Sequence, residues 1–139
     1  MQQQNSIVII DGQGGKIGAQ LVNELLAAVP AAAITAVGTN STATAAMKKA
    51  GAHSAATGEN AVLVACRHAD VIIGPLGIVI ADSLVGEVSP SMAVAVGQSR
   101  AEKILIPVNR CNNMVAGVQE KPVASLIAEA VQMAKKAFA

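Results

Sequence analysis

Short apolar runs rich in β-branched residues alternate along the chain with longer segments in which apolar residues recur every three to four positions. The first pattern is typical of buried parallel strands, and the second of helices that pack one face on a sheet. Strands are predicted at residues 6–10, 33–37, 53–56, 71–73, 103–107 and 112–118. Helices are predicted at residues 16–29, 42–50, 59–68 and 90–97, and a last one from Pro122 onward.

This alternation predicts an α/β fold with a single doubly wound, Rossmann-like sheet. The sheet is expected to be mostly parallel and to carry helices on both faces, because parallel strands need crossover helices. The 139 residues are enough for one hydrophobic core and too few for two ordinary domains. We therefore expect residues 1–139 to form a single domain.

The charge balance argues against polyanionic partners. Ten Lys and Arg against nine Asp and Glu leave a formal net charge of +1, which gives no field to hold nucleic acid or an anionic membrane. Phe138 is the single aromatic residue, so platforms for stacked bases are not expected either.

The composition also bears on self-association. Hydrophobic residues make up 53% of the chain and charged residues 14%, which is a low share of charge for the surface of a monomer. A homo-oligomer is expected, most simply a two-fold dimer.

The sequence favours a cytoplasmic protein without a metal. Residues 1–6 lack the basic and apolar regions of a secretory signal. The longest strongly apolar run, residues 71–81, is too short for a membrane span. Cys66 and Cys111 are far apart and in no metal-ligand spacing, so neither a disulfide framework nor a zinc site is expected.

The most informative stretch leads from the first predicted strand into the first predicted helix and reads Asp11-Gly12-Gln13-Gly14-Gly15-Lys16-Ile17-Gly18. Gly12, Gly15 and Gly18 have the spacing of the GxxGxxG variant of the dinucleotide fingerprint. Such a turn lets backbone N–H groups approach a pyrophosphate at the helix N-terminus. It indicates a nucleotide or another phosphate ligand, and the alternative is a tight strand-to-helix turn without a ligand.

The end of the second predicted strand bears on the choice of cofactor. NAD sites usually place an Asp or Glu there to hold the ribose hydroxyls, whereas this chain has Gly38-Thr39-Asn40-Ser41. NADP is therefore modestly favoured over NAD, and a smaller nucleotide also fits. Asp11 has three interpretations: it accepts ribose hydroxyls, it holds a hydrated Mg²⁺ beside a phosphate, or it bonds the N–H groups of the turn.

Polar residues after other predicted strands would meet the glycine turn at the carboxyl edge of the sheet, where ligands of open α/β folds bind. They include Gly74 and Pro75 after one strand, and Asn109 and Arg110 after another. Arg110 is the strongest anion ligand among them, because its guanidinium grips phosphate or carboxylate through two hydrogen bonds. Its alternative is a structural ion pair with an acidic residue.

The candidate catalysts have no triad spacing, and no catalytic residue is assigned. Glu59 and Glu87 are the alternative ion-pair partners of Arg110 and also candidate general acids or bases. His68 is expected to cap a helix end. Cys66 is expected in the core, and Cys111 is expected to be a small residue at a strand end rather than a reactive thiol.

Five motifs resemble those of a family of short bacterial proteins known only as a domain of unknown function, at residues 11–15, 38–41, 56–60, 73–78 and 106–112. The likeness spans nearly the whole chain. It implies a short Rossmann-like protein and supplies no activity, substrate or catalytic residue. The turn at residues 12–18 is also similar to that of malate-dehydrogenase-like and short-chain-reductase-like Rossmann domains. Their chemistry does not carry over, because they use a catalytic His or a Tyr-x-x-x-Lys pair and this chain has no Tyr.

Together these features predict a nucleotide-binding domain with NAD(P) as the expected cofactor. The expected cofactor-binding residues are Asp11, Gly12, Gln13, Gly14, Gly15, Lys16, Ile17, Gly18, Thr39, Asn40, Ser41, Gly74, Pro75, Asn109 and Arg110. If the protein is an enzyme, an NAD(P)-dependent oxidoreductase is expected, with substrate at a subunit interface or on a partner chain. The alternatives are a non-catalytic nucleotide or anion sensor acting through a protein partner, and a small enzyme on a phosphorylated or carboxylated metabolite.

Overall fold

A computed structural model describes residues 4–108, 110 and 112–139. The strands are β1 (Ser6–Asp11), β2 (Ala33–Gly38), β3 (Ser54–Thr57), β4 (Val71–Pro75) and β5 (Glu102–Ile106). The helices are α1 (Lys16–Ala28), α2 (Ser41–Lys49), α3 (Glu59–Cys66), α4 (Pro90–Gln98) and α5 (Val123–Ala137), with a short 3-10 helix, η1 (Leu76–Val79), after β4. These elements match the predicted ones to within a few residues, with one exception given below.

The five strands form one parallel sheet in the order β3-β2-β1-β4-β5. β1 lies at its centre, paired with β2 from Ser6↔Ala33 to Asp11↔Gly38 and with β4 at Ile9↔Ile73. The predicted α/β class and Rossmann-like sheet are therefore confirmed.

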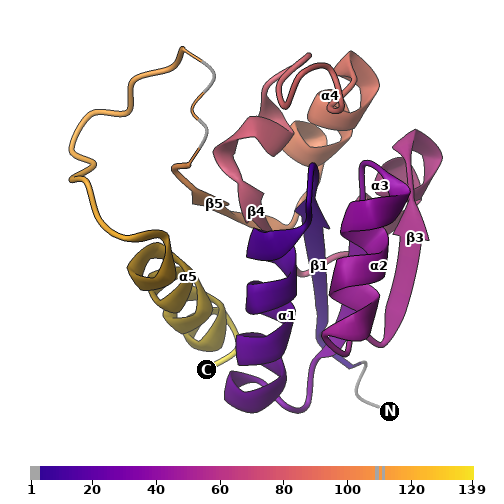
Figure 1. The fold of residues 1–139 in the computed structure, drawn as a ribbon. Helices are drawn as coiled ribbons and strands as arrows, with labels where there is room; N and C mark the ends of the chain where they lie inside the picture. Colours follow the sequence, from indigo (N-terminus) through magenta and orange to yellow (C-terminus); the bar gives the residue numbers. More distant parts are fainter. Residues whose placement is uncertain (1–3, 109, 111) are drawn as a thin grey trace.

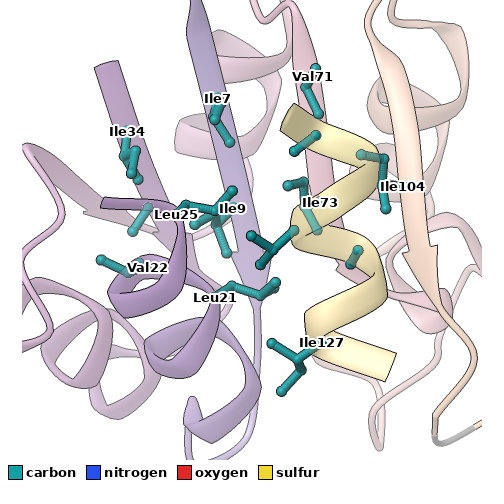
Figure 2. Close-up of a cluster of buried hydrophobic side chains, with 14 of the residues drawn as sticks. Ile7, Ile9, Leu21, Val22, Leu25, Ile34, Val71, Ile73, Ile104 and Ile127 are labelled. Atoms are coloured by element: carbon teal, nitrogen blue, oxygen red, sulfur yellow. The ribbon is translucent and has the colours of Figure 1, made fainter. Parts of the chain in front are cut away.

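Helices cover both faces of the sheet. Helices α1, α2 and α5 lie side by side on one face, and α3 and α4 lie together on the other (Figure 1). Alternate residues of β1 pack against the helices on the two faces of the sheet, because successive side chains of a strand point to opposite faces. Ile7 and Ile9 are buried with α1 and α5, and Val8 and Ile10 with α3 and α4. Figure 2 shows the first layer, in which Leu21 of α1 and Ile127 of α5 lie against the strand isoleucines.

The strand predicted at residues 112–118 is wrong. This segment forms turns and irregular backbone between β5 and α5 and lies away from the sheet (Figure 1). Its backbone turns through left-handed conformations at Asn112 (φ 65°) and Gly117 (φ 82°), and residues 112–117 are exposed. A run with no neighbouring strand and no buried face has nothing to hold it extended.

The topology creates a crevice at the carboxyl ends of β1 and β4. The chain leaves β1 towards α1 on one face of the sheet, and it leaves β4 towards α4 on the opposite face. Open α/β sheets bind their ligands where neighbouring strands diverge in this way. Among the described residues, no helix is long and apolar enough to cross a bilayer.

Candidate functional site

A pocket of about 400 Å³ occupies the crevice between β1 and β4. Its floor is the glycine turn, and its other walls come from the end of β4, the segment after η1, the segment just after β5 and the start of α5. The lining residues are Asp11, Gly12, Gln13, Gly14, Gly15, Lys16, Ile17, Pro75, Leu84, Val108 and Val123. The turn and Pro75, which the sequence assigned to one ligand site, are thus brought together.

The turn presents backbone donors to this pocket. Gly15 is the N-cap of α1 in a left-handed conformation (φ 75°), and as a glycine it has no side chain to cap the helix. The N–H of Gly15 bonds the carbonyl of Gly12 at 2.9 Å, and the first helical bond runs from Ala19 to Gly15. Within the described part of the chain, the N–H groups of Lys16 and Ile17 have no hydrogen-bond partner. Two donors with the positive end of a helix dipole behind them are suited to an anion.

The glycines of the turn differ in what surrounds them. A methyl group on Gly15 would meet the backbone of Ala43 in α2, and one on Gly18 would meet Met47. One on Gly12 would meet Thr39, Glu87 and Leu84. These three glycines allow close packing of protein on protein.

Gly14 is the exception among the glycines of the turn. No atom lies within 4 Å of the position that its Cβ would take, and this residue lines the pocket. Gly14 therefore leaves open space on the ligand side of the turn.

Asp11 holds the turn together. Its Oδ1 accepts the N–H of Gly12 at 2.8 Å, and its Oδ2 accepts the N–H of Gly18 at 2.7 Å. The side chain is buried, and this desolvation raises its pKa, although the two hydrogen bonds act in the opposite direction. Of its three interpretations, bonding of the turn is the one that the contacts show. No group of three or more metal-binding side chains occurs among the described residues.

A second carboxylate reaches the turn from the far side of the crevice. Glu87 belongs to residues 80–88, the loop between η1 and α4, which we call the strap. Its Oε1 accepts three hydrogen bonds, from the N–H of Gln13 at 2.8 Å, the hydroxyl of Thr39 at 2.7 Å and the amide of Asn40 at 2.8 Å. Partial burial opposes ionisation, but these hydrogen bonds outweigh it and lower the pKa of Glu87.

The backbone of the strap is strained. Asp82, Leu84, Val85 and Gly86 all have left-handed conformations, with φ between 55° and 85°. For Leu84 and Val85 this conformation is unfavourable and persists only where the surroundings enforce it. Buried Leu84 packs on Gly12, and the strap closes on itself through hydrogen bonds between residues 82, 83 and 88.

The end of β2 also meets the strap. Thr39 directly follows β2, and Asn40 is the N-cap of α2, with its Oδ1 accepting the N–H of Ala43 at 2.8 Å. The Asn40 amide in addition bonds the carbonyl of Gln13 at 3.0 Å, so this side chain ties the turn to α2. Ser41 begins α2 and is exposed. Thr39 and Asn40 therefore lie beside the turn, as expected of cofactor-site residues, but they bind Glu87.

The remaining sequence candidates lie elsewhere. Gly74 is packed against the carbonyl of Ile10. Arg110 donates from Nε to the carbonyl of Pro107 at 3.1 Å and lines a neighbouring cavity, so it is not a wall of the glycine-turn pocket. Asn109 lies outside the described residues.

Two further residues considered in the sequence analysis, Glu59 and Cys66, are not walls of this pocket. Glu59 accepts the hydroxyl of Ser89 at 2.6 Å, and neither Glu59 nor Glu87 pairs with Arg110. Cys66 is in the core as expected, and burial raises the pKa of its thiol to about 11. Cys111 lies outside the described residues.

Fold and site together define a Rossmann-like α/β protein with a glycine turn at the divergence point of its parallel sheet. The sequence profile of one family, described as a domain of unknown function (DUF3842), matches residues 6–139. The chain belongs to this family, which confirms the resemblance noted from its motifs. Comparison with curated proteins and with solved structures gave no match.

Proposed function

We propose that this protein binds a nucleotide, with NAD(P) as the expected ligand, and that the glycine turn holds its phosphates. The observation that carries the proposal is the pair of N–H groups at Lys16 and Ile17, which have no partner among the described residues and belong to residues that line a pocket at the divergence point of the sheet. Helix N-termini at this place in α/β folds are suited to pyrophosphate groups.

The pocket fits part of such a ligand. Its volume of about 400 Å³ is within the range of small-molecule sites. Beyond the turn, its walls are the apolar residues Leu84, Val108 and Val123, which suit an uncharged ring more than a second phosphate. The phosphates would lie over Gly14, where the turn leaves open space.

The proposal is tested by Gly14→Ala, with Gly97→Ala in α4 as the matched control. Neither site has a neighbour within 4 Å of the added methyl or a left-handed φ, so both variants should fold. Thermal shifts are measured with NAD, NADH, NADP, NADPH, FAD, ATP, coenzyme A and inorganic phosphate. A ligand at 100 times its Kd adds about 2.7 kcal/mol to the free energy of unfolding, which raises the melting temperature by several degrees.

We expect a dinucleotide to raise the melting temperature of the wild type and of Gly97→Ala, and to have a much smaller effect on Gly14→Ala. The methyl group would occupy the space that the pyrophosphate needs. Equal shifts in all three proteins would indicate that the ligand binds away from the turn. No shift with any nucleotide would leave the turn as a purely structural connection.

A second candidate is a nucleotide sensor that acts through a protein partner. Of the described residues that line the pocket, only Asp11 and Lys16 carry ionisable side chains, and both oxygens of Asp11 are bonded within the turn. This lining favours binding over proton transfer by the protein's own groups. Oxidation of NADH with a panel of carbonyl compounds distinguishes this sensor from an NAD(P)-dependent oxidoreductase, because a sensor gives no turnover.

A further inference from the structure

We infer that Glu87 is a specificity residue: it accepts the free ribose hydroxyls of the bound nucleotide and excludes a 2′-phosphate. This inference rests on the proposed nucleotide site and specifies the ligand further. It assigns to the strap a role that dinucleotide-binding sheets usually give to an acidic residue at the end of the second strand.

The first argument is the position of the carboxylate. Glu87 is bonded to Thr39, the residue that directly follows β2, and to Asn40, the N-cap of α2. Through the N–H of Gln13 it is also bonded to the glycine turn. The carboxylate therefore lies beside the lining of the pocket, between the end of β2 and the expected phosphate site, and a ribose linked to those phosphates would reach it there.

The second argument is how the two oxygens of Glu87 are used. All three hydrogen bonds fall on Oε1, which fixes the group in place. Among the described residues, Oε2 has no hydrogen-bond partner, and the side chain is only partly buried. A carboxylate anchored by one oxygen leaves the other free to accept ligand hydroxyls.

The third argument is charge. Three donors lower the pKa of Glu87, so the group is ionised at neutral pH. Within the described part of the chain, no Lys or Arg pairs with Glu87, Thr39 or Asn40. A 2′-phosphate at this position would meet a like charge without a compensating cation, which is unfavourable. The site should therefore prefer NAD to NADP, the reverse of the preference drawn from residues 38–41 alone.

The test is calorimetric titration of NAD and NADP into the wild type, Glu87→Gln and Asp82→Asn. Asp82 is an exposed carboxylate of the same strap, which makes its variant the matched control. We expect the wild type and Asp82→Asn to bind NAD at least about tenfold more tightly than NADP, since hydrogen bonds to charged groups have this magnitude. In Glu87→Gln the ratio of the two Kd values should fall by about tenfold.

The outcomes separate this inference from the proposed function. If both cofactors bind and Glu87→Gln leaves their ratio unchanged, the specificity role is overturned and the nucleotide site stands. A wild type that prefers NADP overturns the role whether or not the variant folds. If neither cofactor binds the wild type, the proposed function fails and this inference fails with it.

Discussion

Two carboxylates beside the glycine turn have different surroundings and therefore different roles. Asp11 is buried, and both of its oxygens accept N–H groups of the turn. Glu87 is partly buried and bonded through one oxygen only. The first is a structural group, and the second has acceptor capacity left for a ligand.

The pH dependence of stability should report the anchoring of Glu87. The pKa of Glu87 is lowered in the folded protein. The ionised side chain therefore stabilises the fold at pH values above the ordinary carboxyl pKa of roughly 4, and this stabilisation is lost as the pH falls through the lowered pKa. Asp11, whose pKa is raised, contributes with the opposite sign. Burial, the main cause of the raised pKa of Asp11, is the same in the wild type and in Glu87→Gln, and repulsion from Glu87 is the smallest cause, so comparing the two proteins removes most of the Asp11 effect.

We therefore expect Glu87→Gln to melt below the wild type at pH 7 and the difference to shrink as the pH falls from about 5 to 3. Calorimetric melting over this range is the measurement. Glu102→Gln, at an exposed position of β5, is the control and should show no comparable trend. A constant difference between the wild type and Glu87→Gln at all pH values would contradict the anchoring.

At the residue scale, the sequence identified the turn but not its partner. The spacing of the glycines predicted a strand-turn-helix unit, and bonding of the turn was among the interpretations of Asp11. The hydrogen bond between Glu87 and Gln13 spans 74 positions and forms because β4 lies beside β1. No local pattern encodes such a contact, so only knowledge of the strand order could have placed Glu87 at the turn.

At the element scale, the fold holds the strap in a backbone conformation that its residues do not favour. Val85 has a φ of 57° and is 95% exposed, so its side chain contributes little packing while its backbone is strained. Asn tolerates left-handed conformations better than β-branched residues do. We expect Val85→Asn to stabilise the protein by about 1 kcal/mol, measured by urea unfolding.

The control for this change is Val94→Asn. Val94 is also exposed, at 52%, but it lies within helix α4 and has no left-handed φ. Relief of strain cannot operate there, and Asn is no better a helix former than Val. Equal effects of the two substitutions would show that the strap stores no strain at Val85.

The elements themselves were largely readable from the hydrophobic pattern. Strands such as β1 and β4 are buried on both faces and appear as continuous apolar runs, and α1 and α5 show one apolar face. Residues 112–118 were misread because a short, partly apolar run resembles a strand even where no neighbour pairs with it. Pairing is a property of the sheet and is not visible in a single segment.

At the scale of the whole molecule, the order of strands makes the site. Placing β4 next to β1, with their following helices on opposite faces, opens the pocket and brings the strap over the turn. This arrangement explains why residues from five separate parts of the chain line one cavity. The expected homo-oligomer stays a prediction, and light scattering at several concentrations would test it.

The most direct measurement of the central claim is an NMR titration of the ¹⁵N-labelled protein with NAD. We expect the largest shifts at the backbone amides of Gly14, Lys16 and Ile17, because these residues line the pocket and the proposed function places their N–H groups next to the phosphates. In Gly14→Ala these shifts should be lost at the same concentration of NAD. Unchanged amides along the turn in the wild type, at saturating NAD, would contradict the account.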